Sequence, residues 1–326
     1  MNKKLSIIIP VYNAADYIDK CMASILAQVQ PEYEILLIND GSTDNSKEII
    51  QGYQERYPDF VRAISKANEG CAKTRDYGIR EARGQYICFI DNDDSILPDY
   101  FETFLNAIDN SQYDIVIGGY KRVSDDAVLF TVNVPKKESI WAKYMVITPW
   151  AKIFRRQFLI DHNIQFLNYG IGEDLYFNMA CYVNNARVKN ISYNGYRWYF
   201  NTKSISNTAQ TKITDDTDPL LLLKTIYEMA GQEQVVYICW YIKTGIYYLL
   251  TCCKQGEPKE FIRHYHRIFD WYQEKNIRRW FPMAGPITYG ERFSVKAIIN
   301  IFLLLDRLHL VPLFARIYCA GKSDEV

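Results

Sequence analysis

The chain has 326 residues, of which 48% are hydrophobic and 23% charged. This composition is typical of a soluble globular protein and excludes a mainly disordered, collagen-like or coiled-coil chain. The 38 basic and 38 acidic side chains balance, so no net charge draws in nucleic acid or an anionic membrane. We therefore expect no nucleic-acid partner, and the length suits two domains or one large one.

The cysteines and the N-terminus indicate the compartment. None of the eight cysteines forms a C-x-x-C pair, so their spacing suggests neither a zinc site nor a redox motif. Their apolar neighbours are typical of buried thiols in a reducing compartment. The N-terminal MNKKLSIIIP is basic and then apolar, but its apolar run is too short for a signal peptide. We expect a cytoplasmic protein.

Strand-like and helix-like segments alternate over residues 5–118. Continuous apolar runs predict strands that are buried on both faces. These runs are Leu5–Ile9, Ile35–Ile38, Val61–Ser65, Tyr86–Ile90 and Ile115–Ile117. Helical patterns lie between them, at residues 18–29, 43–57, 70–83 and from Pro98 onward, and Ser42 or Thr43 can cap the second helix. Repeated βα units predict an α/β fold, in which helices cover both faces of a mostly parallel sheet.

The rest of the chain changes character twice. Residues 119–214 are less regular and rich in Trp and Tyr. From about Asp215 the pattern is helical to the end, and prolines mark the breaks between the predicted helices. We therefore predict one domain over residues 1–214, with halves of about 1–118 and 119–214, followed by a helical C-terminal region over residues 215–326.

One stretch of that region, Val235–Cys253, is long enough to span a bilayer, which takes about 20 residues. Lys243 lies at its centre, where a charge is costly in a membrane. The favoured interpretation is a buried helix, and a helix lying in the membrane surface stays open as the alternative. Ile298–Leu305 is a second candidate for membrane contact, and residues 254–326 carry 12 basic against 8 acidic side chains.

Three polar clusters directly follow predicted strands. They are Pro10-Val11-Tyr12-Asn13, Asn39-Asp40-Gly41-Ser42 and Asp91-Asn92-Asp93-Asp94. In open α/β sheets, ligands bind at the carboxyl ends of the strands, so we expect the clusters to converge on one crevice. The sequence has no G-x-G-x-x-G and no P-loop, which argues against a dinucleotide enzyme or an ATPase.

The third cluster contains a D-x-D, Asp91-Asn92-Asp93. Two carboxylates at a strand end can bind Mg²⁺ or Mn²⁺, and such a cation would bridge the two phosphates of a nucleotide diphosphate. The motif is weak by itself because acidic turns are common.

Asp40, at a neighbouring strand end, can accept the N–H of a nucleobase. An ordinary turn with a helix cap is the alternative there, and both roles can hold together.

Four segments together resemble the inverting glycosyltransferases of family 2, which have a GT-A fold, and in particular those of bacterial capsule and exopolysaccharide synthesis. The segments are SIIIPVYNAADYIDKCMASILAQ, YEILLINDGSTDNSKEII, NEGCAKTRDYGIREARGQYICFIDNDDSILPDY, and WAKIFRR with GIGEDLYFN. They occur in the family's order, cover residues 5–105 almost continuously and return at 150–206. No motif covers the chain from about residue 215.

The resemblance implies a binding site for a UDP-sugar donor. The residues on that side are Pro10, Val11, Tyr12, Asn13, Asp40, Lys66, Asn68, Arg75, Asp91, Asn92 and Asp94. The first four would lie along the uridine, and Asp40 would contact the base. Arg75 would face the diphosphate, with a solvated helix charge as the alternative. Asp91 would lie near the ribose and the metal, Asp93 would be the more direct ligand of Mn²⁺ or Mg²⁺, and Asp94 would lie near the sugar.

The resemblance also implies a catalytic pair and an acceptor side. Glu173 and Asp174 match the acidic pair that supplies the base, and the first turn of a helix is the alternative role for both. Trp150, Lys152 and Trp198 match segments on the acceptor side, and burial in the core is the alternative for the two tryptophans.

The sequence departs from the family's pattern at a few positions. Asn92 stands where small residues are commoner, which we expect to be harmless, and Asp76 stands where Asn is usual. The aromatic segment around Trp198 contains no His, so the histidine metal ligand of some relatives is not expected here.

These features predict a metal-dependent, inverting glycosyltransferase that moves a hexose or N-acetylhexosamine from a UDP-sugar to a hydroxyl of a glycan. Direct displacement at the anomeric carbon needs one carboxylate as general base, preferably Asp174, and a cation at Asp93 would stabilise the departing diphosphate. We expect a lipid-linked acceptor, surface polysaccharide synthesis and peripheral contact with the inner face of the membrane.

Two alternatives stay open, a sugar-phosphate nucleotidyltransferase and a catalytically silent, membrane-associated scaffold of the same fold. The sequence does not name the sugar, the acceptor, the linkage or the oligomeric state.

Overall fold

The computed structural model describes residues 3–109, 112–125, 127–135, 139–200, 217–232, 234–253 and 256–320. The chain forms two compact units. Unit 1 comprises Met1–Glu138, Met145–Asn168 and Glu173–Phe200, and unit 2 comprises Ser139–Tyr144, Tyr169–Gly172 and Asn201–Val326. The predicted domain boundary at residues 214–215 lies outside the described residues.

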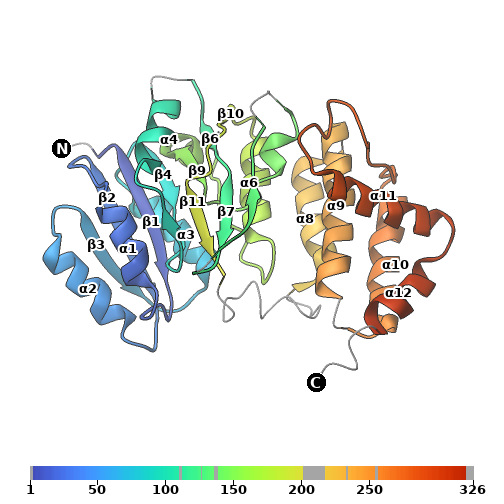
Figure 1. The fold of residues 1–326 in the computed structure, drawn as a ribbon, viewed down its shortest axis with the longest axis horizontal. Coiled ribbons are helices and arrows are strands. Elements are labelled where there is room, and N and C mark those ends of the chain that lie inside the picture. The colour runs from blue at the N-terminus through green and yellow to red at the C-terminus, as the bar shows by residue number, and fades with distance from the viewer. Residues whose placement is uncertain are drawn as a thin grey trace. The chain divides into compact units, whose positions relative to one another are not determined.

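A seven-stranded sheet forms the centre of unit 1 (Figure 1). Its strands, in spatial order, are β10 (Val188–Asn190), β6 (Ile115–Ile117), β9 (Lys152–Arg155), β4 (Tyr86–Phe89), β1 (Leu5–Val11), β2 (Tyr33–Asp40) and β3 (Val61–Lys66). All neighbours run parallel except β9, which is antiparallel to β4 and β6. The predicted α/β fold with a mostly parallel sheet is thereby confirmed. Every residue of β1 is buried, as expected of a strand inside such a sheet.

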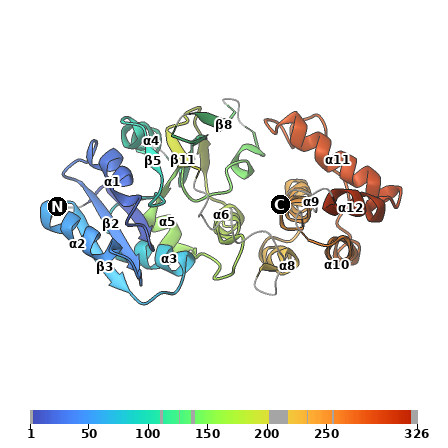
Figure 2. The same ribbon diagram turned by 60° about the horizontal axis from the view of Figure 1, so that its bottom comes forward.

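Helices cover this sheet on both faces. Three of them connect β1 to β4 in turn: α1 (Ile18–Leu26), α2 (Ser46–Arg56) and α3 (Cys71–Glu81). Figure 2 shows α1 and α3 on opposite sides of the β1–β2 pair. Right-handed crossovers explain this, because the chain moves from β1 to β3 in one direction along the sheet and returns to reach β4. Unit 1 also contains α4 (Tyr100–Ile108), α5 (Arg156–Asp161) and α6 (Glu173–Val183).

A smaller sheet joins three strands of the half predicted to be less regular to one strand of the first half. Its four strands, in spatial order, are β5 (Ser95–Ile96), β11 (Tyr196–Tyr199), β7 (Tyr120–Val123) and β8 (Val128–Val132). β11 is antiparallel to β5 and parallel to β7. The strand that follows the D-x-D therefore pairs with the aromatic segment around Trp198.

Unit 2 is helical, as predicted. It contains a short 3₁₀ helix (Ala142–Tyr144) and the helices α8 (Pro219–Ala230), α9 (Val235–Cys252), α10 (Pro258–Glu274), α11 (Phe293–Arg307) and α12 (Val311–Ala320). α9, with a mean hydropathy of 1.3, is long and apolar enough to cross a membrane by length and composition. However, 67% of it is buried, and Lys243 forms an ion pair with Glu291. These contacts support the interpretation of α9 as a buried helix.

Candidate functional site

The three polar clusters lie at the carboxyl ends of β1, β2 and β4, which are neighbours in the sheet. Hydrogen bonds connect their loops directly. The Asn92 side-chain amide donates to the Pro10 carbonyl at 2.8 Å, and the Thr43 amide donates to Asn13 Oδ1 at 2.8 Å. The structure thus brings the clusters together at one edge of the sheet, and what they bind there stays a prediction.

The first cluster offers two of its four side chains to a ligand. Pro10 and Val11 are buried in β1, whereas Tyr12 is 47% exposed and Asn13 lies in the loop with a φ of 48°. Ser42 Oγ accepts a hydrogen bond from the Asn13 amide at 3.1 Å. The expected helix cap is wrong, because α2 begins only at Ser46 while the polar groups before it bind the Asn13 loop.

Asp40, the residue predicted to contact a nucleobase, is 3% exposed. Its carboxylate accepts hydrogen bonds from Lys66 Nζ at 2.5 Å, from the Glu69 amide at 3.0 Å and from the Gly70 amide at 2.9 Å. A carboxylate offers about four lone-pair sites, so about one is left for a further donor. Asp40 therefore fixes the start of α3, and a base contact would come in addition to this role.

The segment after β3 packs tightly against the turn that follows Asp40. Gly41 has a φ of 67°, and a Cβ there would lie 2.8 Å from the Asn68 amide nitrogen. Only glycine suits this position. Lys66 and Asn68, both assigned to the donor side, thus lie beside the end of β2, and Asn68 is exposed.

Arg75 connects two of the predicted groups. One guanidinium nitrogen donates to Asp91 at 2.8 Å, and another donates to Asp174 at 2.8 Å. Arg75 is 4% exposed, so the alternative of a solvated helix charge is wrong. Its Nε has no hydrogen-bond partner among the described residues, and the guanidinium carbon lies 5.4 Å from the centroid of the Phe166 ring. The arginine is therefore held between the D-x-D and the predicted catalytic acid.

Asp76, which departs from the family's pattern, supports this arrangement. Its carboxylate accepts a hydrogen bond from the Phe166 amide at 2.9 Å, and burial raises the pKa of Asp76 to about 6. The Phe166 ring in turn stacks on Phe177 of α6, with centroids 4.0 Å apart. Phe166 thus links α3, which carries Arg75, to α6, which carries Asp174.

Asp174 lies in the first turn of α6, next to Glu173. Burial raises the pKa of Asp174 to about 7; Arg75 acts to lower it, while the carboxylates of Glu173 and Asp91 act to raise it. The side chain keeps 23% exposure, so a small hydroxyl can approach it. A carboxyl group with a pKa near 7 is suited to accept and release a proton at neutral pH.

The acids of the D-x-D cluster differ in their surroundings. Asp91 keeps 29% side-chain exposure, whereas Asp94 is 1% exposed. Asp94 accepts hydrogen bonds from the Tyr196 hydroxyl at 2.7 Å and from the Tyr199 amide at 2.8 Å. Burial, and then the charges of Asp93 and Asp91, raise the pKa of Asp94 well above its usual range. Asp94 therefore anchors β11, and its contact with a donor sugar stays a prediction.

Among the described residues, no group of three or more His, Cys, Asp or Glu side chains is placed to hold a metal ion. Two observations nonetheless fit a divalent cation at the D-x-D. Asp91 and Asp93 supply the oxygen ligands that Mg²⁺ and Mn²⁺ prefer. Their negative charges also add to the effect of burial in raising the pKa of Asp94. A cation bound by Asp91 and Asp93 would relieve this repulsion.

Lys152, assigned to the acceptor side, has no exposed surface. Its ammonium group donates to the Val146 and Thr148 carbonyls, each at 2.7 Å, and to Asn178 Oδ1 at 2.5 Å. Asn178 in turn donates to the Asp174 carbonyl at 2.7 Å. Lys152 therefore supports α6 behind Asp174, and it offers no surface for direct contact with an acceptor.

The two tryptophans of the acceptor side lie in one aromatic cluster. Trp150 is 3% exposed and stacks on Tyr196, with centroids 4.4 Å apart, so the core alternative describes it better. Trp198 is half-buried, and its ring centroid lies 5.8 Å from that of Trp150. Trp198 is therefore the more accessible of the two to a substrate.

Arg122 is a charged residue of this region that the sequence did not indicate. It is 3% exposed, its guanidinium carbon lies 3.4 Å from the Trp198 centroid, and its Nη1 has no hydrogen-bond partner in the described part of the chain. Burial lowers the pKa of Arg122, while Asp94 and Asp93 oppose this. No motif surrounds Arg122, and only the register of β7 with β11, which places it opposite Trp198, reveals the pair.

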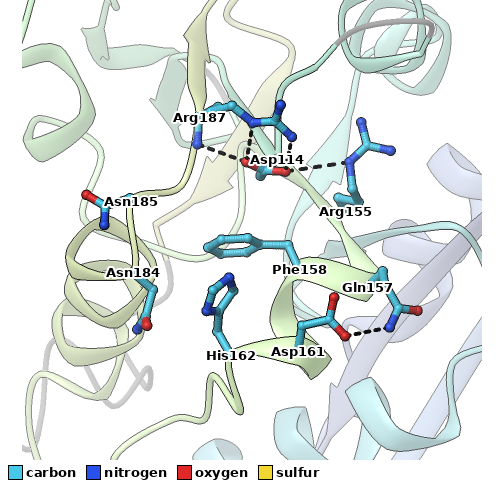
Figure 3. A pocket seen from close by; sticks show the side chains of 9 residues that line it. All are labelled: Asp114, Arg155, Gln157, Phe158, Asp161, His162, Asn184, Asn185 and Arg187. Atoms are coloured by element: carbon cyan, nitrogen blue, oxygen red, sulfur yellow. Dashed lines mark hydrogen bonds and ion pairs between the residues drawn. The ribbon is translucent and has the colours of Figure 1, made fainter.

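A separate pocket opens at the other end of the strands (Figure 3). Asp114, which lines it, precedes β6, and Arg155 ends the antiparallel β9, so this pocket lies away from the carboxyl ends that carry the three clusters. The Asp114 carboxylate accepts two hydrogen bonds from the Arg187 guanidinium, each of 3.0 Å. These bonds join the starts of β6 and β10, which is a structural role.

Comparison with known proteins yields one family. The model described as glycosyl transferase family 2 matches residues 6–167. YibD of Escherichia coli strain K12, described as an uncharacterized glycosyltransferase, is 30% identical over 62% of this chain, and the match spans 63% of its own length. EpsJ of Bacillus subtilis strain 168, described in the same words, is 27% identical over 88% of this chain and 90% of its own.

A solved structure shows the same fold. Residues 1–349 of S. aureus TarS, in complex with UDP-GlcNAc, match this chain with a TM-score of 0.63 and 19% identity. The match covers 99% of this chain and 93% of that one. At this identity the likeness concerns the fold alone, and it agrees with a GT-A fold followed by a helical C-terminal region.

Proposed function

The chain belongs to glycosyltransferase family 2, and we propose that it is an inverting enzyme that transfers a hexose or N-acetylhexosamine from a UDP-sugar to a hydroxyl of a glycan. The observation that carries the proposal is the pair of hydrogen bonds from Arg75 to Asp91 and to Asp174. Arg75 thus holds Asp91, at a strand end suited to a nucleotide, close to Asp174, whose carboxyl group has a pKa of about 7. A donor site and a general base are the two parts that such a transfer needs.

The donor would lie across the ends of β1, β2 and β4. The exposed ring of Tyr12 and the remaining acceptor site of Asp40 are the groups available to a uracil base. The complex of TarS with UDP-GlcNAc supports UDP as the nucleotide, because that protein shares this fold. Asn92, which binds the Pro10 carbonyl, keeps the D-x-D beside the end of β1.

Asp174 would act as the general base. It would take the proton of the attacking hydroxyl while that oxygen bonds to the anomeric carbon and the bond to the diphosphate oxygen breaks on the opposite face, which inverts the configuration. Arg75 binds Asp174 Oδ1, so Oδ2 can face the hydroxyl. Glu173, the neighbouring acid of the pair, is the alternative base.

The D-x-D would bind the metal. Asp91 and Asp93 would hold Mn²⁺ or Mg²⁺, which would stabilise the negative charge that develops on the departing diphosphate. Asp94 supports this turn through its bonds to β11, and Arg75 holds the Asp91 side chain in place.

The setting is a further part of the proposal. We expect a lipid-linked acceptor, surface polysaccharide synthesis, and a cytoplasmic enzyme that contacts the inner face of the membrane. The resemblance to capsule and exopolysaccharide enzymes supports the pathway. Fractionation of expressing cells tests the location, and complete recovery in the soluble fraction without detergent would contradict membrane contact.

Hydrolysis of the donor is the first test of the activity. Purified protein is incubated with a panel of UDP-sugars and Mn²⁺ or Mg²⁺, and free UDP is quantified with and without EDTA. We expect metal-dependent UDP release from one sugar and UDP binding by calorimetry. If neither release nor binding occurs, the proposal is wrong, and release of pyrophosphate from UTP and a sugar phosphate would support the nucleotidyltransferase instead.

A further inference from the structure

The outward face of α11 is apolar. Its exposed large hydrophobic side chains are Phe293, Ile298, Ile301 and Leu304, with exposures of 74%, 51%, 58% and 53%, and Leu308 follows at 56%. They recur every three to five positions, so they form one stripe along the helix. A surface helix of a soluble domain normally turns such a stripe inward and polar side chains outward.

α12 and the residue before it also expose large apolar side chains. Leu310, Leu313 and Ile317 are exposed by 39%, 56% and 70%. Of the 20 exposed large hydrophobic residues in the described part of the chain, eight therefore lie between residues 293 and 317. Single exposed apolar residues are normal on a protein surface, whereas a cluster of this kind marks an interaction site.

The core of unit 2 fixes which face of each helix points outward. Phe302 of α11 packs against Phe261 and Phe269 of α10, with centroids 6.4 and 5.9 Å apart. Phe314 of α12 packs against Phe261 at 5.9 Å and against Phe302 at 6.0 Å. The two helices thus have a second apolar face that packs against α10, and the exposed side chains are additional to it. α11 and α12 are neighbours in both views of the fold (Figures 1 and 2).

The exposed charges within this segment of the chain have one sign. Residues 292–319 are all described, and their exposed ionisable side chains are those of Arg292, Arg307, His309 and Arg316. The one acid of this segment, Asp306, is 4% exposed and accepts hydrogen bonds from the Tyr265 hydroxyl at 2.7 Å and from Arg279. This segment therefore combines exposed apolar side chains with exposed arginines.

We propose that the outward face of α11 and α12 is a peripheral membrane-contact surface that binds an anionic lipid bilayer. The apolar stripe would enter the boundary between headgroups and acyl chains, and the arginines would lie among the phosphates. A second copy of the chain fits less well, because a two-fold pairing brings each patch against itself. The arginines of both copies would then face one another, and residues 292–319 contain no exposed acid to pair with them.

This inference deepens the proposed function and rests on it for the choice of a membrane, because it names the surface through which the enzyme would reach a lipid-linked acceptor. It also separates the membrane contact from α9. The apolar α9 is mostly buried, so the contact would depend on α11 and α12, which do not need to cross the bilayer.

The test is co-sedimentation of the full chain with vesicles of phosphatidylcholine, with and without phosphatidylglycerol. The wild type should bind the anionic vesicles, and binding should weaken as salt is added. The triple variant I301S/L304S/I317S should lower the partition coefficient between vesicles and water about tenfold or more, since three apolar side chains no longer enter the bilayer. R307Q/R316Q should remove the preference for phosphatidylglycerol. The control Leu221→Ser changes an equally exposed apolar residue of α8 and should leave binding unchanged.

Three results would overturn the proposal. The wild type could stay in the supernatant with both kinds of vesicle, or the triple variant could sediment with the vesicles to the same extent as the wild type. The third result is a concentration-dependent dimer that the triple variant abolishes, which would make a second copy the occupant. UDP release from the donor in free solution should be unchanged in every variant, so loss of vesicle binding and failure of the proposed activity are distinguishable.

Discussion

The Arg75 guanidinium donates to the Asp174 carboxylate at 2.8 Å, although the two residues lie 99 positions apart in the chain. α3 supplies the arginine and α6 the acid, and a second guanidinium nitrogen reaches Asp91 after β4. A buried arginine that is shared by two carboxylates holds both in place. Groups coupled in this way respond to one another, so a change at any of the three should alter the electrostatics of the other two.

Asp174→Asn should lower kcat for sugar transfer about 10²- to 10⁴-fold, because an amide cannot take the proton of the attacking hydroxyl. UDP binding by calorimetry should be almost unchanged, since the base contacts the acceptor. The control is Asp161→Asn, which changes an exposed acid of α5 and should leave kcat as it is. A larger loss in Glu173→Gln than in Asp174→Asn would transfer the role of base to Glu173.

The pH profile should follow the Asp174 carboxyl group. Its pKa of about 7 predicts that kcat/KM falls about tenfold per pH unit below that value, because the base must be deprotonated to act. The effect on stability has the opposite sign to that of an acid whose pKa is lowered by folding, because burial outweighs the ion pair with Arg75 and raises the pKa of Asp174. Between pH 7 and about 4 the folded protein keeps a proton on Asp174, whereas the unfolded chain has lost it. The free energy of unfolding should therefore rise as the pH falls through 7, because a charged carboxylate no longer has to be buried. A profile that stays flat from pH 5 to pH 8 would exclude Asp174 as the base.

Arg75→Gln should destabilise the protein by about 1–3 kcal/mol, less than for a fully buried ion pair, because Asp91 and Asp174 keep some exposure to water. Loss of the Arg75 guanidinium should also raise the pKa of Asp174 and move the acidic limb of the pH profile to higher pH. Urea unfolding and the pH dependence of UDP release measure the two effects. The matched control is Arg80→Gln, on the exposed side of the same helix, for which neither should change.

The strands and their polar ends could be predicted from local sequence. β1 is a continuous apolar run followed by a polar loop, and β4 ends shortly before the D-x-D, so both the parallel sheet and the shared edge follow from pattern and topology. The pairing of Arg75 with Asp174 could not be predicted in this way. It depends on how α3 and α6 pack through Phe166, and no local pattern encodes that contact.

Burial was the hardest property to predict for polar side chains. A lysine is normally expected on the surface. Lys152 nevertheless has no exposed surface, because its ammonium group donates hydrogen bonds to the Asn178 side chain and to two backbone carbonyls. The cap expected at Ser42 or Thr43 failed for a related reason. Asn13, from another loop, binds both residues, and such long-range competition is invisible in the local pattern.

Arg122→Met tests whether the charge of Arg122, which contacts Trp198, acts on the acids of the D-x-D cluster. Asp94 and Asp93 act to raise the pKa of Arg122, so these groups interact, and removal of the arginine should make this end of the sheet more negative. A more negative site binds a cation more tightly and an anionic donor less tightly. We therefore expect the affinity for Mn²⁺, measured by calorimetry without nucleotide, to rise about threefold or more, and the KM for the UDP-sugar to rise as well.

The same substitution removes the contact of the guanidinium with the Trp198 ring, which is worth about 0.5–2 kcal/mol. A general loss of stability could lower activity without any electrostatic role. Lys121→Met is the matched control, because it removes a cation from the neighbouring position of β7, which faces the opposite side of the sheet. If Arg122→Met weakens Mn²⁺ binding, or if both variants change it equally, the charge of Arg122 does not act on the D-x-D.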